Sequence, residues 1–303
     1  MQIRLATRVS PLALWQARHV AGLILSHGSD REVVEVGIET TGDRVRDKPL
    51  GQIGGDGLFT REVQAAILDG RADAAVHSLK DLPTAPISGL CLAAVPKRGP
   101  TGDAFVSTRH TSLDKMPRGA RVGTSSIRRK AQLLWRRPDL EIVDLRGNVD
   151  TRLRKLTDQG LDAIVLAEAG LVRLGLAARI TEILDRAWML PAVGQGAIGI
   201  EAATDLTEAG KEIAKIADAS THAQVLAERS FLANLGGGCL VPIGVDCVPV
   251  DDKRFTMRGV VLTPQGTERL EGSETGNLSD PEELGSRLAR NLIAQGAAEI
   301  LGL

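Results

Sequence analysis

Two segments of the sequence place arginine where a helix is expected to begin. In LATRVSPLALW, Ser10 can cap a helix that starts at Pro11, and Arg8 lies just before the cap. In RVGTSSIRRKA, the Thr-Ser-Ser run can cap a helix that carries Arg128 and Arg129 in its first turn. Arginine at this end opposes the helix dipole and therefore lowers stability unless an anion lies nearby.

A third segment, IVDLRGNVDTRLRK, repeats the arrangement. Arg146 follows an expected strand, Asn148 can cap, and Arg152 lies on the next helix. Free N–H groups at helix N-termini bind anions, and arginine adds bidentate contacts to carboxylates. Three such turns predict a pocket for a polyanion. The alternative is a set of solvated surface arginines.

The segment HSLKDLP, residues 77–83, also follows an expected strand. Lys80 and Asp81 are adjacent, so both could reach one cleft from a turn. One interpretation gives Asp81 proton transfer or the binding of an N–H or cationic group; the other is a surface ion pair of little energetic value. His77 lies in an apolar run and is expected to be structural.

The sequence contains three cysteines in different surroundings. Cys91 and Cys247 lie in apolar, strand-like runs and are predicted to be core residues. Cys239 follows three glycines in LGGGCLVPIG, which leaves its approach without side chains. An odd count without a C-x-x-C pair argues against a disulfide framework and against a zinc site. The residues alone leave Cys239 open between a turn cysteine and a reactive thiol.

The composition indicates a soluble globular protein of about two domains. Of its 303 residues, 43% are hydrophobic and 25% are charged, and the net charge of -1 provides no general attraction for nucleic acid or membrane. Four Phe, three Trp and no Tyr argue against a protein that stacks on single-stranded nucleic acid. The N-terminal residues show no secretory signal, which favours a cytoplasmic location without disulfides or metal.

Strand-like and helical segments alternate through the first two hundred residues, which indicates α/β units with mainly parallel sheets. A weak internal repeat relates residues 4–17 to 121–133 and residues 70–78 to 160–168. We therefore expect two similar lobes, joined by a hinge at 95–103. Residues 41–60 are glycine-rich and charged, as expected of a mobile lid, and residues 191–201 are expected to return the chain to the first lobe.

The sequence changes in character after about residue 217. A helix is expected over 221–235, followed by strands over 241–250 and 254–264 and by a final amphipathic helix over 280–301. This pattern predicts a small α+β domain with Cys239 at its first helix-to-strand turn.

Six segments in register resemble the porphobilinogen deaminase family, also called hydroxymethylbilane synthases. They are TRVSPLALWQA, HSLKDLP, GTSSIRR, LRGNVDTRL, LPAVGQGAIGIE and GGGC followed by VPIG, and they extend along the whole chain. The resemblance implies two periplasmic-binding-protein-like (type II) lobes and a small α+β C-terminal domain. The implied domains are 1–96 with 195–216, then 102–190, then 217–303.

The family resemblance also implies the activity. Four porphobilinogen molecules are condensed head to tail onto a dipyrromethane cofactor, each with loss of ammonia, and hydrolysis releases hydroxymethylbilane for tetrapyrrole synthesis. The cofactor would be held by a thioether to Cys239, and Asp81 would be the catalytic residue and would also contact the cofactor. The other residues implied to bind the cofactor are Lys80, Thr124, Ser126, Arg128, Arg129 and Arg146. Those implied to serve substrate or the growing chain are Arg8, Ser10, Gln16, Arg152, Arg173 and Gln195. Porphobilinogen would be the only partner of a monomeric enzyme.

The sequence departs from the family pattern at three positions. Asp56 and Arg61 stand where lysine is common, and Leu240 follows the cysteine where glutamine is common. Asp56 removes a positive charge from the expected lid. The alternative function is that of a non-catalytic two-lobed binding protein for a small polyanion, which the third domain and its glycine-flanked cysteine disfavour.

Overall fold

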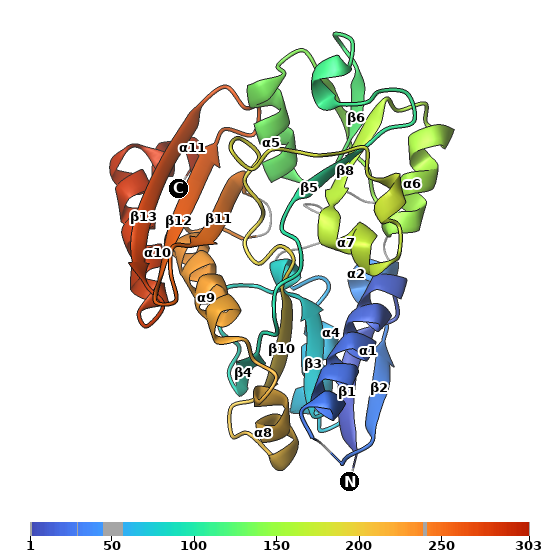
Figure 1. Cartoon of the computed structure of the whole chain (residues 1–303), viewed down its shortest axis with the longest axis vertical. Helices are drawn as coiled ribbons and strands as arrows, with labels where there is room; N and C mark the ends of the chain where they lie inside the picture. The colour runs from blue at the N-terminus through green and yellow to red at the C-terminus, as the bar shows by residue number, and fades with distance from the viewer. Residues whose placement is uncertain (1, 29, 45–56, 239–240, 303) are drawn as a thin grey trace. The chain divides into compact units, whose positions relative to one another are not determined.

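The structure is a computed structural model that describes residues 2–28, 30–44, 57–238 and 241–302. The chain divides into two compact units, residues 1–99 with 196–222 and residues 100–195 with 223–303. Within the described ranges, no helix has both the length and the apolar character needed to cross a membrane. Figure 1 labels most of the helices and strands of both units.

The first unit is built on a five-stranded mixed sheet in the order β2-β1-β3-β10-β4 (Figure 1). Neighbouring strands β1 and β2, and β1 and β3, are parallel, whereas β10 runs antiparallel to both β3 and β4, so four strands share one direction. The strands are β1 (Ile3–Arg8), β2 (Val33–Ile38), β3 (Ala74–Ser78), β4 (Leu90–Ala94) and β10 (Ile198–Ala203).

Helices cover both faces of this sheet. Apolar side chains of α1 (Pro11–Ser26) and α8 (Glu208–Ala214) share one core with β1, β3 and β10. Helix α4 (Arg61–Leu68) buries its apolar stripe in a second core with alanines of β1 and β3. Two short helices, α2 (Thr41–Arg44) and the 3-10 helix η1 (Leu79–Asp81), follow β2 and β3. Apolar residues at helical spacing therefore explain why these helices pack on the two faces of the sheet.

The second unit contains a sheet with the equivalent order, β7-β6-β8-β5-β9. Strand β6 is parallel to β7 and β8, and β5 is antiparallel to β8 and β9. The internal repeat seen in the sequence thus corresponds to a shared topology, with β5 in the position that β10 occupies in the first sheet. The strands are β5 (Asp103–Val106), β6 (Arg121–Gly123), β7 (Glu141–Val143), β8 (Ala163–Ala167) and β9 (Glu182–Ile183).

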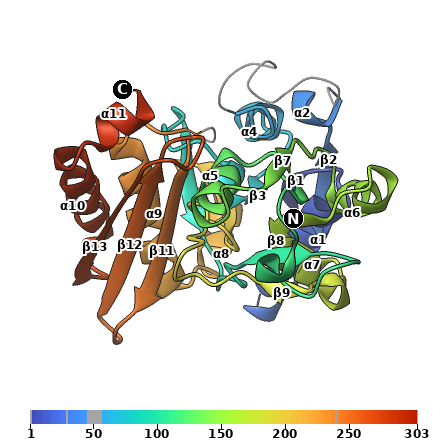
Figure 2. The same cartoon turned by 90° about the horizontal axis from the view of Figure 1, so that it is seen from above.

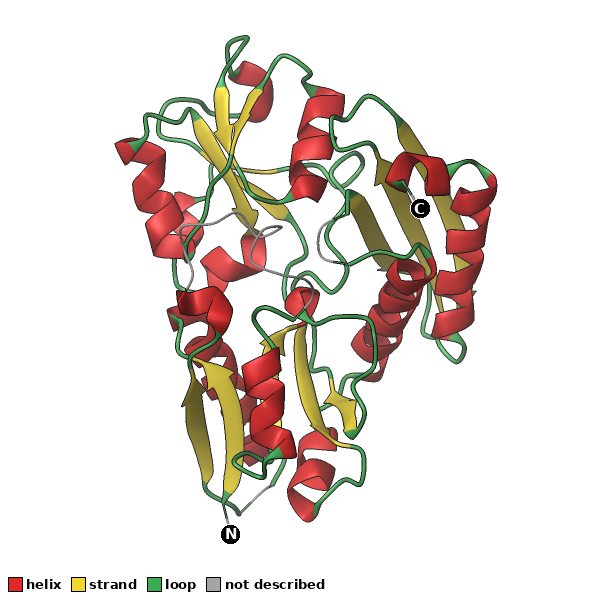
Figure 3. Cartoon of the chain, turned by 180° about the vertical axis from the view of Figure 1, so that it is seen from behind, coloured by secondary structure: helices red, strands yellow, loops and turns green. Residues whose placement is uncertain are grey.

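The helices of this sheet follow its strands, as Figure 3 shows in red and yellow. They are η2 (Leu113–Lys115), α5 (Ile127–Arg136), α6 (Val149–Asp158), α7 (Glu168–Arg173) and η3 (Ala177–Arg179). Apolar side chains form a separate core on each side of the sheet, one that includes α5 and one that includes α6 and α7.

An antiparallel three-stranded sheet completes the second unit, with helices on one of its faces (Figure 2). Its strands are β11 (Ile243–Pro249), β12 (Arg254–Leu262) and β13 (Arg269–Asn277), and its helices are α9 (Ala219–Asn234), α10 (Pro281–Ala294) and α11 (Ala297–Leu301). The expected single C-terminal helix is wrong, because Gly296 adopts a φ of 104° and separates α10 from α11. Only glycine takes this conformation without strain.

The predicted combination of α/β lobes and a small α+β part is confirmed. The prediction for Cys247 is also confirmed, because it lies in the core of the three-stranded sheet. Cys91 on β4 is only partly buried and lies outside the clustered core. The three-domain division stays a prediction, since residues 102–190 and the C-terminal part belong to one compact unit.

Candidate functional site

In the first unit, predicted site residues gather at the carboxyl ends of two adjacent strands. Arg8 is the last residue of β1, while Lys80 and Asp81 lie in η1, which directly follows β3. Because β1 and β3 are parallel neighbours, their carboxyl ends lie at one edge of the sheet. This edge is where open α/β sheets commonly bind ligands.

Helix α1 starts at the same edge. Ser10 caps it, accepting a hydrogen bond at Oγ from the backbone N–H of Ala13 at 3.3 Å. Gln16 is 1% exposed and its amide exchanges hydrogen bonds with the hydroxyl of Ser78, at 2.9 and 3.1 Å. Gln16 thus joins α1 to the end of β3, immediately before the turn that carries Asp81.

The guanidinium group of Arg8 is fixed from two sides. Its Nε and Nη2 donate to the carboxylate of Asp43, and the ring of Phe59 lies 4.3 Å from the guanidinium carbon. Burial alone would raise the pKa of Asp43, but hydrogen bonds and the charge of Arg8 outweigh it and lower that pKa. Asp43 is therefore an ionised partner that orients Arg8.

A polar cluster is buried behind the β3 turn. His77 is 5% exposed, and its Nε2 lies 3.0 Å from the carboxylate of Glu201, which also accepts a hydrogen bond from Gln64 at 2.8 Å. The His77 contact is close but is not aligned as a hydrogen bond. These side chains connect β3, β10 and α4, which agrees with a structural role for His77.

The carboxylate of Asp81 makes no hydrogen bond or ion pair within the described part of the chain.

In the second unit, the loop from β6 to α5 has the predicted capping geometry. The hydroxyl of Ser126 accepts from the backbone N–H of Arg129 at 3.4 Å, and Thr124 Oγ1 accepts from the N–H of Ser126 at 3.2 Å. Both hydroxyls thus order the start of the helix, and Arg128 and Arg129 lie in its first turn.

The two arginines meet a protein carboxylate. Asp103, at the start of β5, is 1% exposed and lies 2.6 Å from Arg128 Nη1 and 2.8 Å from Arg129 Nε. Gln195 donates to the same carboxylate at 3.1 Å. Burial would raise the pKa of Asp103, but the charges of Arg128 and Arg129 outweigh burial and hold it well below its usual range.

Three further predicted arginines follow the other parallel strands of this sheet. Arg146 comes shortly after β7, Arg152 lies in the first turns of α6, and Arg173 ends α7, which follows β8. Arg152 Nε donates to the carbonyl oxygen of Gly147 at 2.8 Å. Burial lowers the pKa of Arg173 to about 10. All three arginines therefore lie on segments that follow strands β7 and β8.

Donors in this group fit an anionic cofactor. Nε of Arg128 and Nη1 of Arg146 are buried and have no hydrogen-bond partner among the described residues. A buried N–H group without a partner costs roughly 1–3 kcal/mol, so such groups favour an acceptor from a ligand. The carboxylates expected on a dipyrromethane would supply those acceptors. No cluster of metal-ligating side chains occurs in the ranges that the structure describes.

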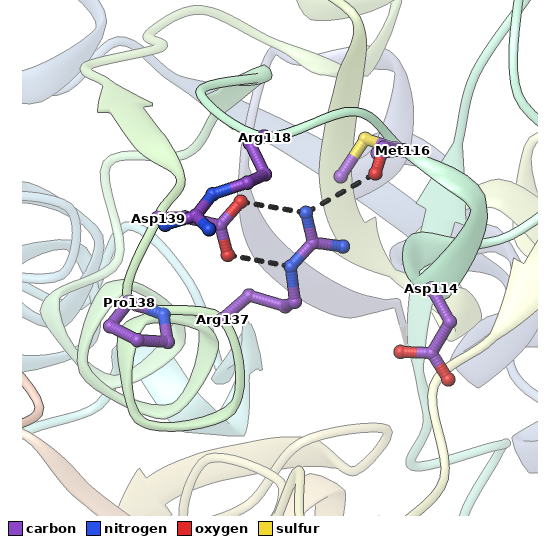
Figure 4. A pocket seen from close by; sticks show the side chains of 6 residues that line it. All are labelled: Asp114, Met116, Arg118, Arg137, Pro138 and Asp139. Atoms are coloured by element: carbon purple, nitrogen blue, oxygen red, sulfur yellow. Dashed lines mark hydrogen bonds and ion pairs between the residues drawn. The ribbon is translucent and has the colours of Figure 1, made fainter.

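A surface hollow of about 680 Å³ lies elsewhere in the second unit. Figure 4 shows Arg137 within it, donating to both oxygens of Asp139 at 2.7 and 2.8 Å and to the carbonyl oxygen of Met116 at 3.2 Å. Asp114 and Arg118 also line it. The hollow lies at the C-terminal end of α5, opposite the end that carries Arg128 and Arg129, so it is not the predicted site.

Sequence reasoning did not find Asp43 and Asp103. Both close a Thr-Gly-Asp tripeptide, at 41–43 and at 101–103, and this repeat was the available signal. A Cβ on Gly42 would lie 2.2 Å from the ring of Phe59, and one on Gly102 would lie 2.5 Å from Glu168. A side chain larger than that of glycine before either aspartate would therefore displace the facing side chain.

Several predictions fall on residues outside the described ranges. Cys239, Leu240 and Asp56 are among them, as is most of the expected lid. Arg61 is described and begins α4.

Comparison with known proteins gives two matches to family models. The one described as porphobilinogen deaminase, dipyromethane cofactor binding domain, matches residues 3–211. The one described as porphobilinogen deaminase, C-terminal domain, matches residues 222–294.

Solved structures resemble the chain more distantly. The methionine-binding protein MetQ is 16% identical, with a TM-score of 0.44 over 71% of this chain and 89% of that one. A periplasmic substrate-binding protein of an ABC transporter from Coxiella burnetii is 15% identical, with a TM-score of 0.46 over 75% of this chain and 95% of that one.

Sequence relatives match over nearly their full length. Porphobilinogen deaminase of Nitratidesulfovibrio vulgaris is 49% identical over 98% of this chain and 95% of its own. Those of Pelotomaculum thermopropionicum and Acidithiobacillus ferrooxidans are each 48% identical over 99% of this chain, and over 96% and 97% of their own. The alternative of a non-catalytic binding protein is not favoured by these matches. The chain belongs to the porphobilinogen deaminase family.

Proposed function

We propose that this chain is a hydroxymethylbilane synthase, a transferase that joins four porphobilinogen molecules head to tail and releases hydroxymethylbilane by hydrolysis. One ammonia is lost at each addition. The observation that carries this function is the full-length identity of 49% to a protein named porphobilinogen deaminase. The arginines at the carboxyl ends of the strands support it, since porphobilinogen carries an acetate and a propionate.

We propose that the cofactor is a dipyrromethane attached to Cys239 through a thioether. When bound, it supplies the pyrrole end to which the first substrate is joined. Thr124, Ser126, Arg128, Arg129 and Arg146 would hold its carboxylates, together with Lys80 of the first unit. The buried donors on Arg128 and Arg146 support this assignment.

We assign the catalytic role to Asp81. Its carboxylate would hold pyrrole N–H groups and stabilise the positive charge that develops as ammonia leaves, for which a fixed negative charge is suited. Arg8, Ser10, Gln16, Arg152, Arg173 and Gln195 would bind substrate or the growing chain. We also propose that the enzyme is a cytoplasmic monomer of three domains. Light scattering would check the oligomeric state, and limited proteolysis would check the domain boundaries.

Intact-protein mass spectrometry under denaturing conditions tests the cofactor. Protein from cells able to make porphobilinogen should carry the added mass of one dipyrromethane. The Cys239→Ser variant should show the unmodified mass and no turnover. Cys91→Ser is the matched control, because Cys91 is a partly buried thiol on β4 and should leave the modification in place. An unmodified wild-type mass would refute the proposed attachment.

A further inference from the structure

A single buried carboxylate connects three of the predicted site residues in the second unit. Asp103 accepts hydrogen bonds from Arg128 at 2.6 and 3.1 Å, from Arg129 at 2.8 Å and from Gln195 at 3.1 Å. All four residues are at most 5% exposed. The four come from β5, α5 and the turn before β10, so Asp103 is the point at which these elements are joined.

The hydrogen bonds divide the two arginines into different environments. Arg128 uses both of its Nη groups within the protein, on Asp103, on the carbonyl oxygen of Leu190 at 2.6 Å and on Gln195 at 3.4 Å. Arg129 uses Nε on Asp103 and Nη1 on the carbonyl oxygen of Val165 at 3.1 Å. Its Nη2 makes no hydrogen bond to any described residue, so Arg129 keeps a complete amino group for a ligand.

The charges in this cluster do not cancel. Two guanidinium groups face one carboxylate, and no other acid lies within 4.0 Å of either arginine in the described ranges. A buried positive charge is costly without an anion, which explains why the group favours a further carboxylate. Asp103 reduces the excess charge while fixing the direction in which Arg129 points.

We propose that Asp103 is a positioning residue for the cofactor. It fixes both Nη groups of Arg128, so that only its Nε remains for the ligand. It also orients Arg129 so that Nη2 is left for the ligand, and it fixes the amide of Gln195. The proposal rests on the proposed function, because the anion that Arg129 receives is taken to be a cofactor carboxylate. Asp103 itself contacts no reacting atom.

The rate of cofactor loading tests this proposal. Apoprotein from cells that cannot make porphobilinogen is incubated with porphobilinogen, and the modified fraction is followed by intact mass. Asp103→Asn keeps the shape of the side chain but removes its charge, and it should load at least tenfold more slowly per folded molecule. Asp103→Glu keeps the charge but displaces the carboxylate, and it should load at a rate between those of Asp103→Asn and wild type.

Asp139→Asn is the matched control. Asp139 forms a comparable bidentate pair with Arg137 at the other end of α5, and its variant should load at the wild-type rate. Cooperative thermal unfolding measured on each variant shows which molecules are folded.

The outcomes separate the inference from the function on which it rests. Wild-type protein that does not load would contradict the proposed function. Wild-type protein that loads, together with folded Asp103→Asn that loads equally fast, would overturn the positioning role. If Asp103→Asn does not fold, folded Asp103→Glu decides: loading at the wild-type rate would overturn the role, and slower loading would support it.

Discussion

The carboxylate of Asp43 accepts two hydrogen bonds from the guanidinium group of Arg8, from Nε at 3.0 Å and from Nη2. This bidentate pair uses one edge of the guanidinium, and our proposal gives the other edge, with Nη1, to a substrate carboxylate. The ring of Phe59 further restricts Arg8 from one face. Asp43 and Phe59 precede and follow residues 45–56 in the sequence.

We expect Asp43→Asn to weaken substrate binding. Loss of a partly buried ion pair costs about 1 kcal/mol, which corresponds to a roughly fivefold higher KM if the orientation of Arg8 matters for binding. Initial rates against porphobilinogen concentration measure it. Asp73→Asn is the control, because Asp73 pairs with Arg4, which lies at the opposite end of β1 from Arg8. An unchanged KM in Asp43→Asn would show that the orientation of Arg8 is unimportant.

Asp81→Ala should abolish most of the turnover while the protein folds normally. A fixed carboxylate that stabilises developing charge or transfers a proton contributes roughly 10²- to 10⁴-fold to the rate. Tetrapyrrole formation measured at saturating substrate gives the loss, and circular dichroism reports the fold. Asp69→Ala, an exposed carboxylate paired with Arg71, should keep full activity. Near-normal turnover by Asp81→Ala would assign the catalytic role to another residue.

Gly285→Ala should destabilise the C-terminal part of the second unit. A Cβ at this position of α10 would lie 2.2 Å from the carbonyl oxygen of Ala227 and 2.8 Å from the backbone nitrogen of Phe231, both on α9. Separating two helix backbones typically costs about 1–3 kcal/mol. Urea unfolding of the variant measures this cost.

Gly22→Ala should increase stability, although Gly22, like Gly285, lies within a helix. Gly22 lies within α1, and no atom lies within 4 Å of the Cβ that would be added. Alanine should therefore stabilise the protein by about 0.5–1 kcal/mol through its higher helix propensity. Equal effects of the two substitutions would contradict the close approach of α9 and α10.

Stability should decrease in acid through paired carboxylates. Burial would raise the pKa of Asp73, but hydrogen bonds from Arg4 and its charge lower it below the usual value of 3.8. A group whose pKa is lower in the folded state stabilises the fold above its unfolded pKa and loses this contribution as pH falls. The free energy of unfolding should therefore decline below about pH 4, with a slope of up to about 1.4 kcal/mol per pH unit for each such group.

The same measurement on Asp73→Asn isolates one group. Its acid limb should be shallower than that of wild type, while Asp69→Asn serves as the exposed control. If the free energy of unfolding falls with the same slope in acid for wild type and Asp73→Asn, the ion pair between Asp73 and Arg4 contributes little in solution.

Alternation of apolar runs with helical patterns predicted most of the first two hundred residues, because buried strands and amphipathic helices have distinct periodicities. Strand β13 was missed, since RLEGSETGN contains little apolar alternation and forms by pairing with the whole of β12. Its place in the sheet is therefore decided by tertiary pairing, which overrides local propensity.

Candidate site residues could be selected from the sequence at the starts of helices, because capping and arginine placement are local features. Their acidic partners were not, because Asp43 lies 35 residues from Arg8 and Asp103 lies 25 residues from Arg128. Such pairs depend on which strand ends the fold brings together. The structure thus adds one carboxylate partner for Arg8 and one that Arg128 and Arg129 share.

The position of β10 between β3 and β4 governs how the chain is completed during synthesis. Strand β4 ends at Ala94, but its neighbour β10 begins only at Ile198. At about 5–20 residues per second, a ribosome leaves β4 without its partner for roughly 5–20 s. All five strands of the second sheet lie within residues 103–183, so that sheet can close while the first is still open. The first sheet therefore starts to be synthesised before the second but is completed after it.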